Sequence, residues 1–186
     1  MKNQLRIIGG EYKRRVLPFA DVDGLRPTPD RVRETLFNWL MWDIQNAQVL
    51  DLCAGSGALS FESLSRGAAH VTIIEPHTAQ AKILKDNLQL LKIQNCKLIV
   101  STAQAAVRHL NRDAFDVVFL DPPYSLNLWQ ELAELTDPLI KNEGLIYVEA
   151  DCPLDSLQLP VSWTLLKQTK AGAVRAGIFQ KVLKAV

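Results

Sequence analysis

Short apolar runs alternate with longer segments of helical periodicity over the middle of this chain of 186 residues. Each short run is continuous and largely apolar, which is typical of strands buried on both faces of a parallel sheet. The intervening segments place apolar residues three or four positions apart, as one face of a helix requires. This order predicts an α/β fold with a Rossmann-like, doubly wound and mostly parallel sheet. Strands are expected at 49–52, 71–74, 98–100, 117–120 and 145–148, and helices at 58–66, 77–91, 103–110 and 128–136.

The two ends of the chain differ from this pattern, because no helix separates their strand-like runs. The runs at 161–168 and 174–183 predict a C-terminal antiparallel hairpin at the edge of the sheet. Near the start, 6–8 and 15–17 are short strand candidates around a glycine pair. They predict a small N-terminal β-hairpin.

These ends define the expected domain organisation. Residues 1–25 are expected to form the hairpin extension, and 26–186 the main α/β domain. Thr28 and Pro29 have the residue types of a helix N-cap and a first helical position, so we expect a helix to start there. A chain of this length can bury a full core as one domain.

Composition excludes several classes of protein. Hydrophobic residues make up 48% and charged residues 22% of the chain, which argues against disorder. No apolar run approaches the ~18 residues of a membrane span, and the chain begins without an apolar signal segment. The scattered cysteines Cys53, Cys96 and Cys152 match neither a disulfide framework nor a zinc site, so a cytoplasmic location is expected.

The formal net charge of +1 conceals an uneven distribution of charge. Basic residues exceed acidic ones over 1–40 and over 161–186, whereas acidic residues exceed basic ones over 41–160. Basic ends on an acidic middle fit a polyanionic partner such as a nucleic acid. A chance fluctuation over short windows would produce the same distribution, so charge alone leaves both interpretations open.

The segment 51–57, Asp-Leu-Cys-Ala-Gly-Ser-Gly, lies between a predicted strand and a predicted helix. Gly55 and Gly57 permit a sharp turn and the close approach of a ligand to the backbone. A dinucleotide fingerprint would need a third glycine where this chain has Ser60. The carboxylate of Asp51 could instead meet a cationic ammonium group, although a tight turn without a ligand would also explain the two glycines.

Glu75 ends the next predicted strand, about 20 residues after the glycine turn. A carboxylate at this place can accept hydrogen bonds from both ribose hydroxyls of a nucleoside. Taken alone, Glu75 would be interpreted as a solvated strand end. Its spacing from the glycine turn favours the ribose interpretation.

The sharpest motif is Asp121-Pro122-Pro123-Tyr124, directly after the strand predicted at 117–120. The two prolines fix the backbone and lack N–H donors, so the neighbouring carbonyls are left to accept hydrogen bonds. Together with the Asp121 carboxylate, these carbonyls suit an exocyclic amino group, which offers two donors. Tyr124 offers a face on which a base can stack, worth about 1–3 kcal/mol.

The motifs at 51–57, 75 and 121–124, in this order, resemble those of class I S-adenosylmethionine-dependent methyltransferases of the amino-methylating type. Three further segments extend the resemblance, over nearly the whole chain, to the D family of small-subunit (16S) ribosomal RNA guanine-N2-methyltransferases. They are Arg-Ile-Ile-Gly-Gly at 6–10, Arg-Pro-Thr-Pro-Asp-Arg-Val-Arg-Glu at 26–34 and Leu-Ile-Tyr-Val-Glu at 145–149. The resemblance implies methylation of the exocyclic N2 of a guanine, at family position 966 of that RNA.

The resemblance also implies a role for each motif. Asp51 and the glycine turn would hold the methionine end of S-adenosylmethionine, and Glu75 its ribose. Asp121 and the carbonyl of Pro122 would accept the N2 hydrogens of the guanine. The implied cofactor residues are Asp51, Cys53, Ala54, Gly55, Gly57, Glu75, Pro76, Thr102, Ala103 and Asp121, and the implied catalytic residues are Asp121, Pro122, Pro123 and Tyr124.

The chain departs from the family at Thr102, where relatives usually carry Asp or Asn. A hydroxyl, with its shorter reach, would have to contact the adenine amino group of the cofactor there. The resemblance requires no metal ion, and no histidine or cysteine is placed to act in the reaction.

The implied partner is 16S ribosomal RNA within the assembled small ribosomal subunit, with no membrane partner, and the protein is expected to be a monomer. The basic N-terminal element would contact phosphates, which gives affinity and salt dependence rather than choice of sequence. A solvated basic face is the alternative. The expected RNA contacts are Arg6, Lys13, Arg14, Arg15, Arg26, Thr28 and Arg31, with Lys170 and Arg175 as further candidates near the C-terminus.

Other functions stay open on the sequence alone. An adenine-N6-methyltransferase acting on DNA or RNA would use the same motif at 121–124, although this chain has no room for a separate DNA-recognition domain. A nicotinamide-dependent oxidoreductase would use the same kind of sheet, but Ser60 and the motif at 121–124 argue against it. A catalytically silent RNA-binding module would share the basic surface without transferring a methyl group.

Overall fold

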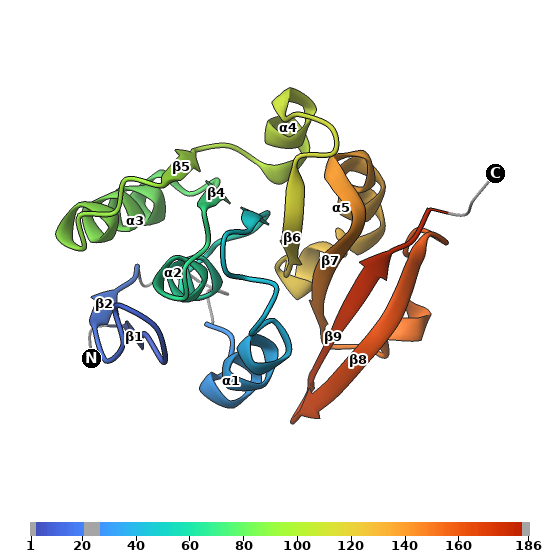
Figure 1. Ribbon diagram of the computed structural model, residues 1–186, viewed down its shortest axis with the longest axis horizontal. Helices are drawn as coiled ribbons and strands as arrows, with labels where there is room; N and C mark the ends of the chain where they lie inside the picture. The colour runs from blue at the N-terminus through green and yellow to red at the C-terminus, as the bar shows by residue number, and fades with distance from the viewer. Residues whose placement is uncertain (1–2, 21–26, 184–186) are drawn as a thin grey trace.

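The computed structural model describes residues 3–20 and 27–183, and a seven-stranded sheet with the strand order β5-β4-β3-β6-β7-β9-β8 runs through its centre (Figure 1). Strands β3 to β7 are parallel to one another, whereas β9 is antiparallel to β7 and β8 is antiparallel to β9. The predicted fold class and the C-terminal hairpin are therefore confirmed. The strands are β3 (Gln48–Asp51), β4 (His70–Ile74), β5 (Cys96–Ile99), β6 (Phe115–Leu120), β7 (Ile140–Ala150), β8 (Trp163–Ala171) and β9 (Val174–Lys181).

Helices cover both faces of this sheet, and each face has its own hydrophobic core. Along β6, Val117 and Phe119 belong to the core that contains residues of α1, α2 and α3, whereas Val118 and Leu120 belong to the core under α4 and α5. Successive side chains of a strand point to opposite faces, so a strand covered on both sides must be apolar throughout. The helices are α1 (Asp30–Trp39), α2 (Ala58–Ser65), α3 (Thr78–Leu90), α4 (Ala103–Ala106) and α5 (Trp129–Thr136), with short 3-10 turns η1 (Val107–His109), η2 (Tyr124–Leu126), η3 (Asp137–Leu139) and η4 (Leu154–Ser156).

The N-terminal hairpin is present, but its strands β1 (Gln4–Arg6) and β2 (Val16–Pro18) are displaced from the predicted 6–8 and 15–17. The reason is a tertiary contact. The backbone N–H groups of Ile8 and Gly9 donate to the carboxylate of Glu62 on α2, at 3.0 and 2.8 Å, and therefore leave the strand pairing.

Close packing against α2 explains the glycine pair at the tip of this hairpin. Gly10 has a φ of 76°, and a Cβ added there would lie 1.9 Å from the carbonyl oxygen of Ser65. The Ser65 hydroxyl in turn donates to the carbonyl oxygen of Gly9 at 2.6 Å. The boundary expected between 25 and 26 lies outside the described residues, so the division into two domains stays a prediction.

The start of α1 corrects one local prediction. The helix begins at Asp30 with Pro29 as its N-cap residue, and Thr28 does not cap it. The Thr28 hydroxyl instead donates to Glu149 at the end of β7, at 3.1 Å. A contact between residues so distant in sequence displaces the local capping bond that the residue types favour. Along 3–20 and 27–183, we find no helix with the length and apolarity that a bilayer crossing requires.

Candidate active site

Four acidic residues lie at one edge of the sheet, where the parallel strands end. Asp51 ends β3, Glu75 follows β4, Asp121 follows β6 and Glu149 lies next to the last residue of β7. The register pairs Asp51 with the penultimate residue Phe119 of β6, so these strand ends are level. Strands β3 and β6 are neighbours at the point where the connections change direction, and such a switch point is where open α/β sheets bind ligands.

The glycine turn between β3 and α2 is compact and already formed. Gly55 and Gly57 have positive φ angles of 55° and 81°, which residues with a Cβ seldom adopt. The backbone N–H of Ala54 donates to the carbonyl of Ile74 on β4, and that of Gly57 donates to Ala54. A Cβ on Gly57 would lie 2.6 Å from a methyl group of Leu84 on α3, so a larger residue would require the neighbouring side chains to move as well as an unfavourable φ.

Asp51 is a buried carboxylate with an exposed fraction of 2%. The Ser60 hydroxyl donates to its Oδ2 at 2.6 Å, which gives a role to the serine that replaces the third glycine of a dinucleotide fingerprint. Burial raises the pKa of Asp51 to about 7, the charge of Glu75 adds to the rise, and the bond from Ser60 opposes it. A cation bound beside Asp51 would restore the charged form.

Glu75 is held by the glycine turn itself. Its two carboxylate oxygens accept the N–H groups of Gly55 and His77, each at 2.9 Å. Burial raises the pKa of Glu75, and these two N–H groups lower it. Each carboxylate oxygen keeps a further lone pair, so the group can still accept hydroxyl donors.

Gln80 is a buried residue of α3 that our sequence reasoning did not single out. Its Nε2 donates to the carbonyl of Gly55, and its Oε1 accepts the N–H of Ala20, both at 2.7 Å. Gln80 therefore joins the glycine turn to the segment that follows the N-terminal hairpin. A lone glutamine inside a helix carries no local signal of such a bridge.

The segment after β6 contains the carboxylate of Asp121 and, three residues later, the aromatic ring of Tyr124. The ring of Tyr124 stacks on Trp129, with centroids 6.0 Å apart and an interplanar angle of 30°. Burial raises the pKa of Asp121 well above its usual value, and the charges of Glu149 and Asp51 add to this rise. Its Oδ2 lies 3.5 Å from the Thr28 hydroxyl, which also contacts Glu149, so Asp121 lies close to the end of β7.

Glu149 is the second residue that sequence reasoning missed, because its position at the end of a predicted strand does not mark it as functional. Its exposed fraction is 4%, and its carboxylate accepts three hydroxyl groups. Tyr124 donates at 2.7 Å, Tyr147 at 2.8 Å and Thr28 at 3.1 Å. The one available signal was a charged residue directly after the apolar run at 145–148.

The remaining expected cofactor residues lie in the loops after β3, β4 and β5. Cys53 is half-buried, and burial raises the pKa of its thiol. Pro76 is exposed directly after Glu75, and Ala103 is buried at the start of α4. The exposed Thr102 hydroxyl caps α4 by accepting the N–H of Ala105 at 3.4 Å, and its contact with the adenine stays a prediction.

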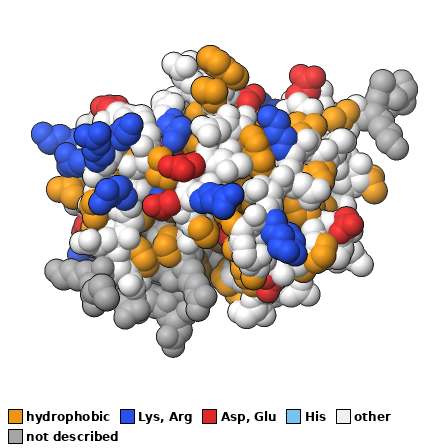
Figure 2. Space-filling view, turned by 90° about the horizontal axis from the view of Figure 1, so that it is seen from below, with side chains coloured by type: hydrophobic (Ala, Val, Ile, Leu, Met, Phe, Trp, Pro, Cys, Tyr) orange, Lys and Arg blue, Asp and Glu red, His pale blue; other side chains and the backbone are white. Residues whose placement is uncertain are grey.

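The residues expected to bind RNA divide into separate groups. Figure 2 shows Lys and Arg side chains gathered at the end of the molecule where β1, β2 and α3 lie. Thr28 is apart from this surface, because it is buried among the acidic residues of the site. Arg26 lies outside the described residues. The exposed members are Arg6, Lys13, Arg14 and Arg15 on the hairpin, Arg31 on α1 and Lys170 on β8, whereas Arg175 on β9 is half-buried.

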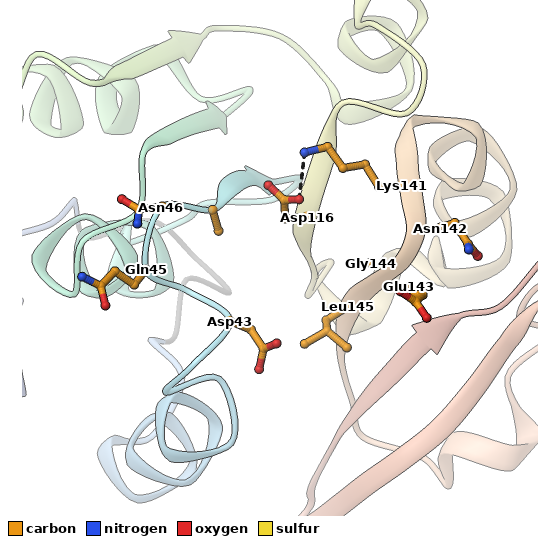
Figure 3. A pocket seen from close by; sticks show the side chains of 10 residues that line it. Asp43, Gln45, Asn46, Asp116, Lys141, Asn142, Glu143, Gly144 and Leu145 are labelled. Carbon is orange, nitrogen blue, oxygen red and sulfur yellow. Dashed lines mark hydrogen bonds and ion pairs between the residues drawn. The ribbon is translucent and has the colours of Figure 1, made fainter.

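A polar pocket lies at the opposite end of the sheet, where β3, β6 and β7 begin (Figure 3). Its central acid, Asp116, is paired with Lys141 at 2.8 Å and accepts the backbone N–H of Gln48 at 2.8 Å. Asp43 and Glu143 are exposed to solvent at its rim. Each acid of this pocket is therefore either solvated or paired with a cation.

The fold and the acidic edge together define a class I methyltransferase. The solved structure described as a putative methyltransferase yhhF from Escherichia coli superposes with a TM-score of 0.88 at 42% identity, covering 97% of this chain and 99% of that chain. A putative methylase from Haemophilus influenzae superposes with a TM-score of 0.82 at 38% identity, covering 97% and 100%.

The family model described as conserved hypothetical protein 95 matches residues 5–180. Ribosomal RNA small subunit methyltransferase D of Escherichia coli is 42% identical over 96% of this chain and 90% of its own length. The protein of the same name from Haemophilus influenzae is 44% identical, over 96% and 95%. The chain belongs to the ribosomal RNA small subunit methyltransferase D family, and the resemblance drawn from the sequence is confirmed at that level.

Proposed function

We propose that this protein transfers a methyl group from S-adenosylmethionine to the exocyclic N2 of a guanine in 16S ribosomal RNA, at the family position 966. The observation that carries the proposal is that Asp51, Glu75 and Asp121 lie at the carboxyl ends of the neighbouring strands β3, β4 and β6, beside the switch point of the sheet. Two of these acids follow the pattern of a nucleoside site, and the third begins the motif suited to an amino group.

The residues present fit the methyl donor. Asp51 is a buried carboxylate that a cationic amino-acid portion would complete, and Glu75 retains acceptor capacity for two ribose hydroxyls. The glycine turn lets the backbone approach the ligand closely. When bound, S-adenosylmethionine supplies a methyl group already activated by its sulfonium.

The segment 121–124 would orient the acceptor. Asp121 and the carbonyl of Pro122 would accept hydrogen bonds from the two N2 hydrogens, which directs the nitrogen lone pair towards the methyl carbon. As the N–C bond forms, the C–S bond of the sulfonium would break to leave the thioether, and one N2 proton would pass to Asp121 and then to solvent. Tyr124 stacks on the purine. Most of the rate enhancement would come from holding the two reacting atoms in line. A guanine within a stem would have to be flipped out, at a cost of a few kcal/mol.

The basic hairpin would bind the RNA backbone around the target. Arg6, Lys13, Arg14 and Arg15 are exposed there, and Glu62 ties the hairpin to α2, the helix that follows the glycine turn. This connection would hold the phosphate contacts at a fixed distance from the reacting groups. We propose the assembled small subunit as the substrate, a monomer as the active form and the cytoplasm as its location.

The experiment that tests this function uses small ribosomal subunits from cells that lack the gene. The purified protein is incubated with these subunits, or with their naked 16S RNA, and methyl-labelled S-adenosylmethionine. Digestion and mass spectrometry should find the label as N2-methylguanosine at one position. Label in N6-methyladenosine would establish the adenine alternative, and tight RNA binding without transfer would establish a silent binding module.

A further inference from the structure

Glu149 is the centre of a hydrogen-bond network that has no part in the cofactor and guanine contacts proposed above. A buried carboxylate loses its hydration and is retained only where hydrogen bonds or charges replace the lost water. Glu149 accepts hydroxyl hydrogens from three different elements, through Thr28 before α1, Tyr124 after β6 and Tyr147 within β7. Among residues 3–20 and 27–183, Glu149 forms no ion pair.

We propose that Glu149 is a positioning residue that fixes the Tyr124 ring and the Asp121 carboxylate for the target base. This inference rests on the proposed function, because it assumes that Tyr124 and Asp121 contact an amino-bearing base. Glu149 itself touches neither the base nor the methyl donor in this account.

Tyr124 is held at two places by the same residue. Its hydroxyl donates to Oε1 of Glu149 at 2.7 Å, which is a short hydrogen bond. Its ring stacks on Trp129, whose Nε1 donates to the backbone carbonyl of Glu149 at 2.8 Å. The half-buried ring therefore has one preferred orientation before any base arrives, and a base that stacks on it need not order it first.

Thr28 carries the second half of the network. Its hydroxyl lies 3.1 Å from Oε2 of Glu149 and 3.5 Å from Oδ2 of Asp121. The hydroxyl stands between the two carboxylates, with its one hydrogen directed to the nearer oxygen, on Glu149, and Asp121 at a longer contact distance. Because Thr28 precedes α1, this bond also fixes the start of the helix that carries the exposed Arg31.

The test compares variants of Glu149 with a variant of the residue through which it acts. Glu149→Ala removes the acceptor, Glu149→Gln keeps the shape and one acceptor oxygen, and Tyr124→Phe removes only the hydroxyl. Glu143→Gln is the matched control, since Glu143 is an exposed residue of the same strand at the far end of the sheet. Turnover and KM for unmethylated small subunits, RNA affinity without methyl donor, S-adenosylhomocysteine affinity and thermal unfolding are measured for each.

We expect Glu149→Ala to lower kcat roughly tenfold to a hundredfold, because a small misplacement of oriented groups has effects of that size. Glu149→Gln should recover part of the loss. Affinity for S-adenosylhomocysteine should stay within about twofold of the wild type, because a positioning role does not involve the donor. The double variant Glu149→Ala/Tyr124→Phe should be no slower than Glu149→Ala alone, since residues that act as one unit are not additive.

Two results would overturn the inference. One is normal kcat in the folded Glu149→Ala or Glu149→Gln protein. The other is a double variant whose loss is the product of the two single losses, which would show that Glu149 does not act through Tyr124. Absence of methyl transfer by the wild type and by Glu143→Gln would instead contradict the proposed function, and the two failures are thereby distinguished.

Discussion

The two ends of the central sheet treat their acidic residues in opposite ways. At the end where the parallel strands begin, Asp116 is partly exposed and paired with Lys141 at 2.8 Å. At the end where they finish, Asp51, Glu75 and Glu149 are buried and, within the described chain, accept hydroxyl and N–H donors. A cation balances the first arrangement, whereas the second accumulates negative charge that neutral donors stabilise.

This difference indicates which end binds a ligand. Burying several carboxylates near one another without a cation is unfavourable, and the raised pKa values of Asp51, Glu75 and Asp121 express that cost. A cationic nucleoside would relieve it. The pocket around Asp116 needs no such relief, because Lys141 already supplies the charge.

The largest effect is expected at Asp121. Asp121→Ala should lower turnover on small-subunit RNA on the order of a hundredfold or more, because it removes a contact that strengthens as the amino group reacts. S-adenosylhomocysteine affinity, measured by calorimetry, should fall far less than turnover. Near-normal turnover in this variant would remove Asp121 from the mechanism.

Asp51→Asn tests whether the buried carboxylate of Asp51 destabilises the protein when no ligand is bound. In the folded protein the pKa of Asp51 lies at about 7, above its value in an unfolded chain. The protonated form is therefore favoured by folding, and the stability it contributes is complete below the unfolded pKa and lost as pH rises through about 7. Asparagine stays neutral, so at pH 8 the variant should unfold at a higher temperature than the wild type. The corresponding gain in the free energy of unfolding is up to about 4 kcal/mol.

The same comparison at pH 4 supplies the control for Asp51→Asn, because both side chains are then neutral in the folded protein. The difference in unfolding temperature should shrink there. If the wild type and Asp51→Asn unfold at equal temperatures at both pH values, the charged carboxylate of Asp51 does not destabilise the folded protein.

A moderate effect is expected at the basic hairpin. Lys13 and Arg15 are exposed there, and changing both to alanine should lower the slope of log affinity against log salt by about 1–2, as the loss of two phosphate contacts would. Arg14 is left unchanged because its φ of 70° makes substitution a backbone problem as well. Arg108 and Arg112, both exposed, provide a control pair with the same loss of charge. An unchanged slope in the hairpin variant would exclude the hairpin from the RNA.

The smallest effect is expected at the far end of the sheet. Asp116→Asn removes a partly exposed ion pair but keeps an oxygen for the N–H of Gln48, so stability should change by less than about 1 kcal/mol. Turnover should be unaffected. A strong loss of turnover would show that the pocket around Asp116 belongs to the site and that the contrast between the two ends is wrong.

The sequence predicted the parts of this molecule that local patterns control. Continuous apolar strands and helical periodicity gave the sheet, and each of the motifs at 51–57, 75 and 121–124 follows a strand at the same edge. The residues that were missed or misplaced depend on distant partners. Thr28 donates a hydrogen bond to Glu149 instead of capping α1, and Gln80 joins two loops. Neither contact could be recognised from the neighbouring residues in the sequence.

The most direct test of the acidic edge is the pH dependence of S-adenosylmethionine binding, measured by calorimetry in buffers of different ionisation enthalpy. If Asp51 must be charged to hold the cationic ligand, affinity should rise as pH increases through about 7, and binding should release protons below that pH. Asp51→Asn should abolish the proton release and weaken binding. A wild-type protein that does not bind S-adenosylmethionine, or that binds it without proton release at any pH, would contradict the account.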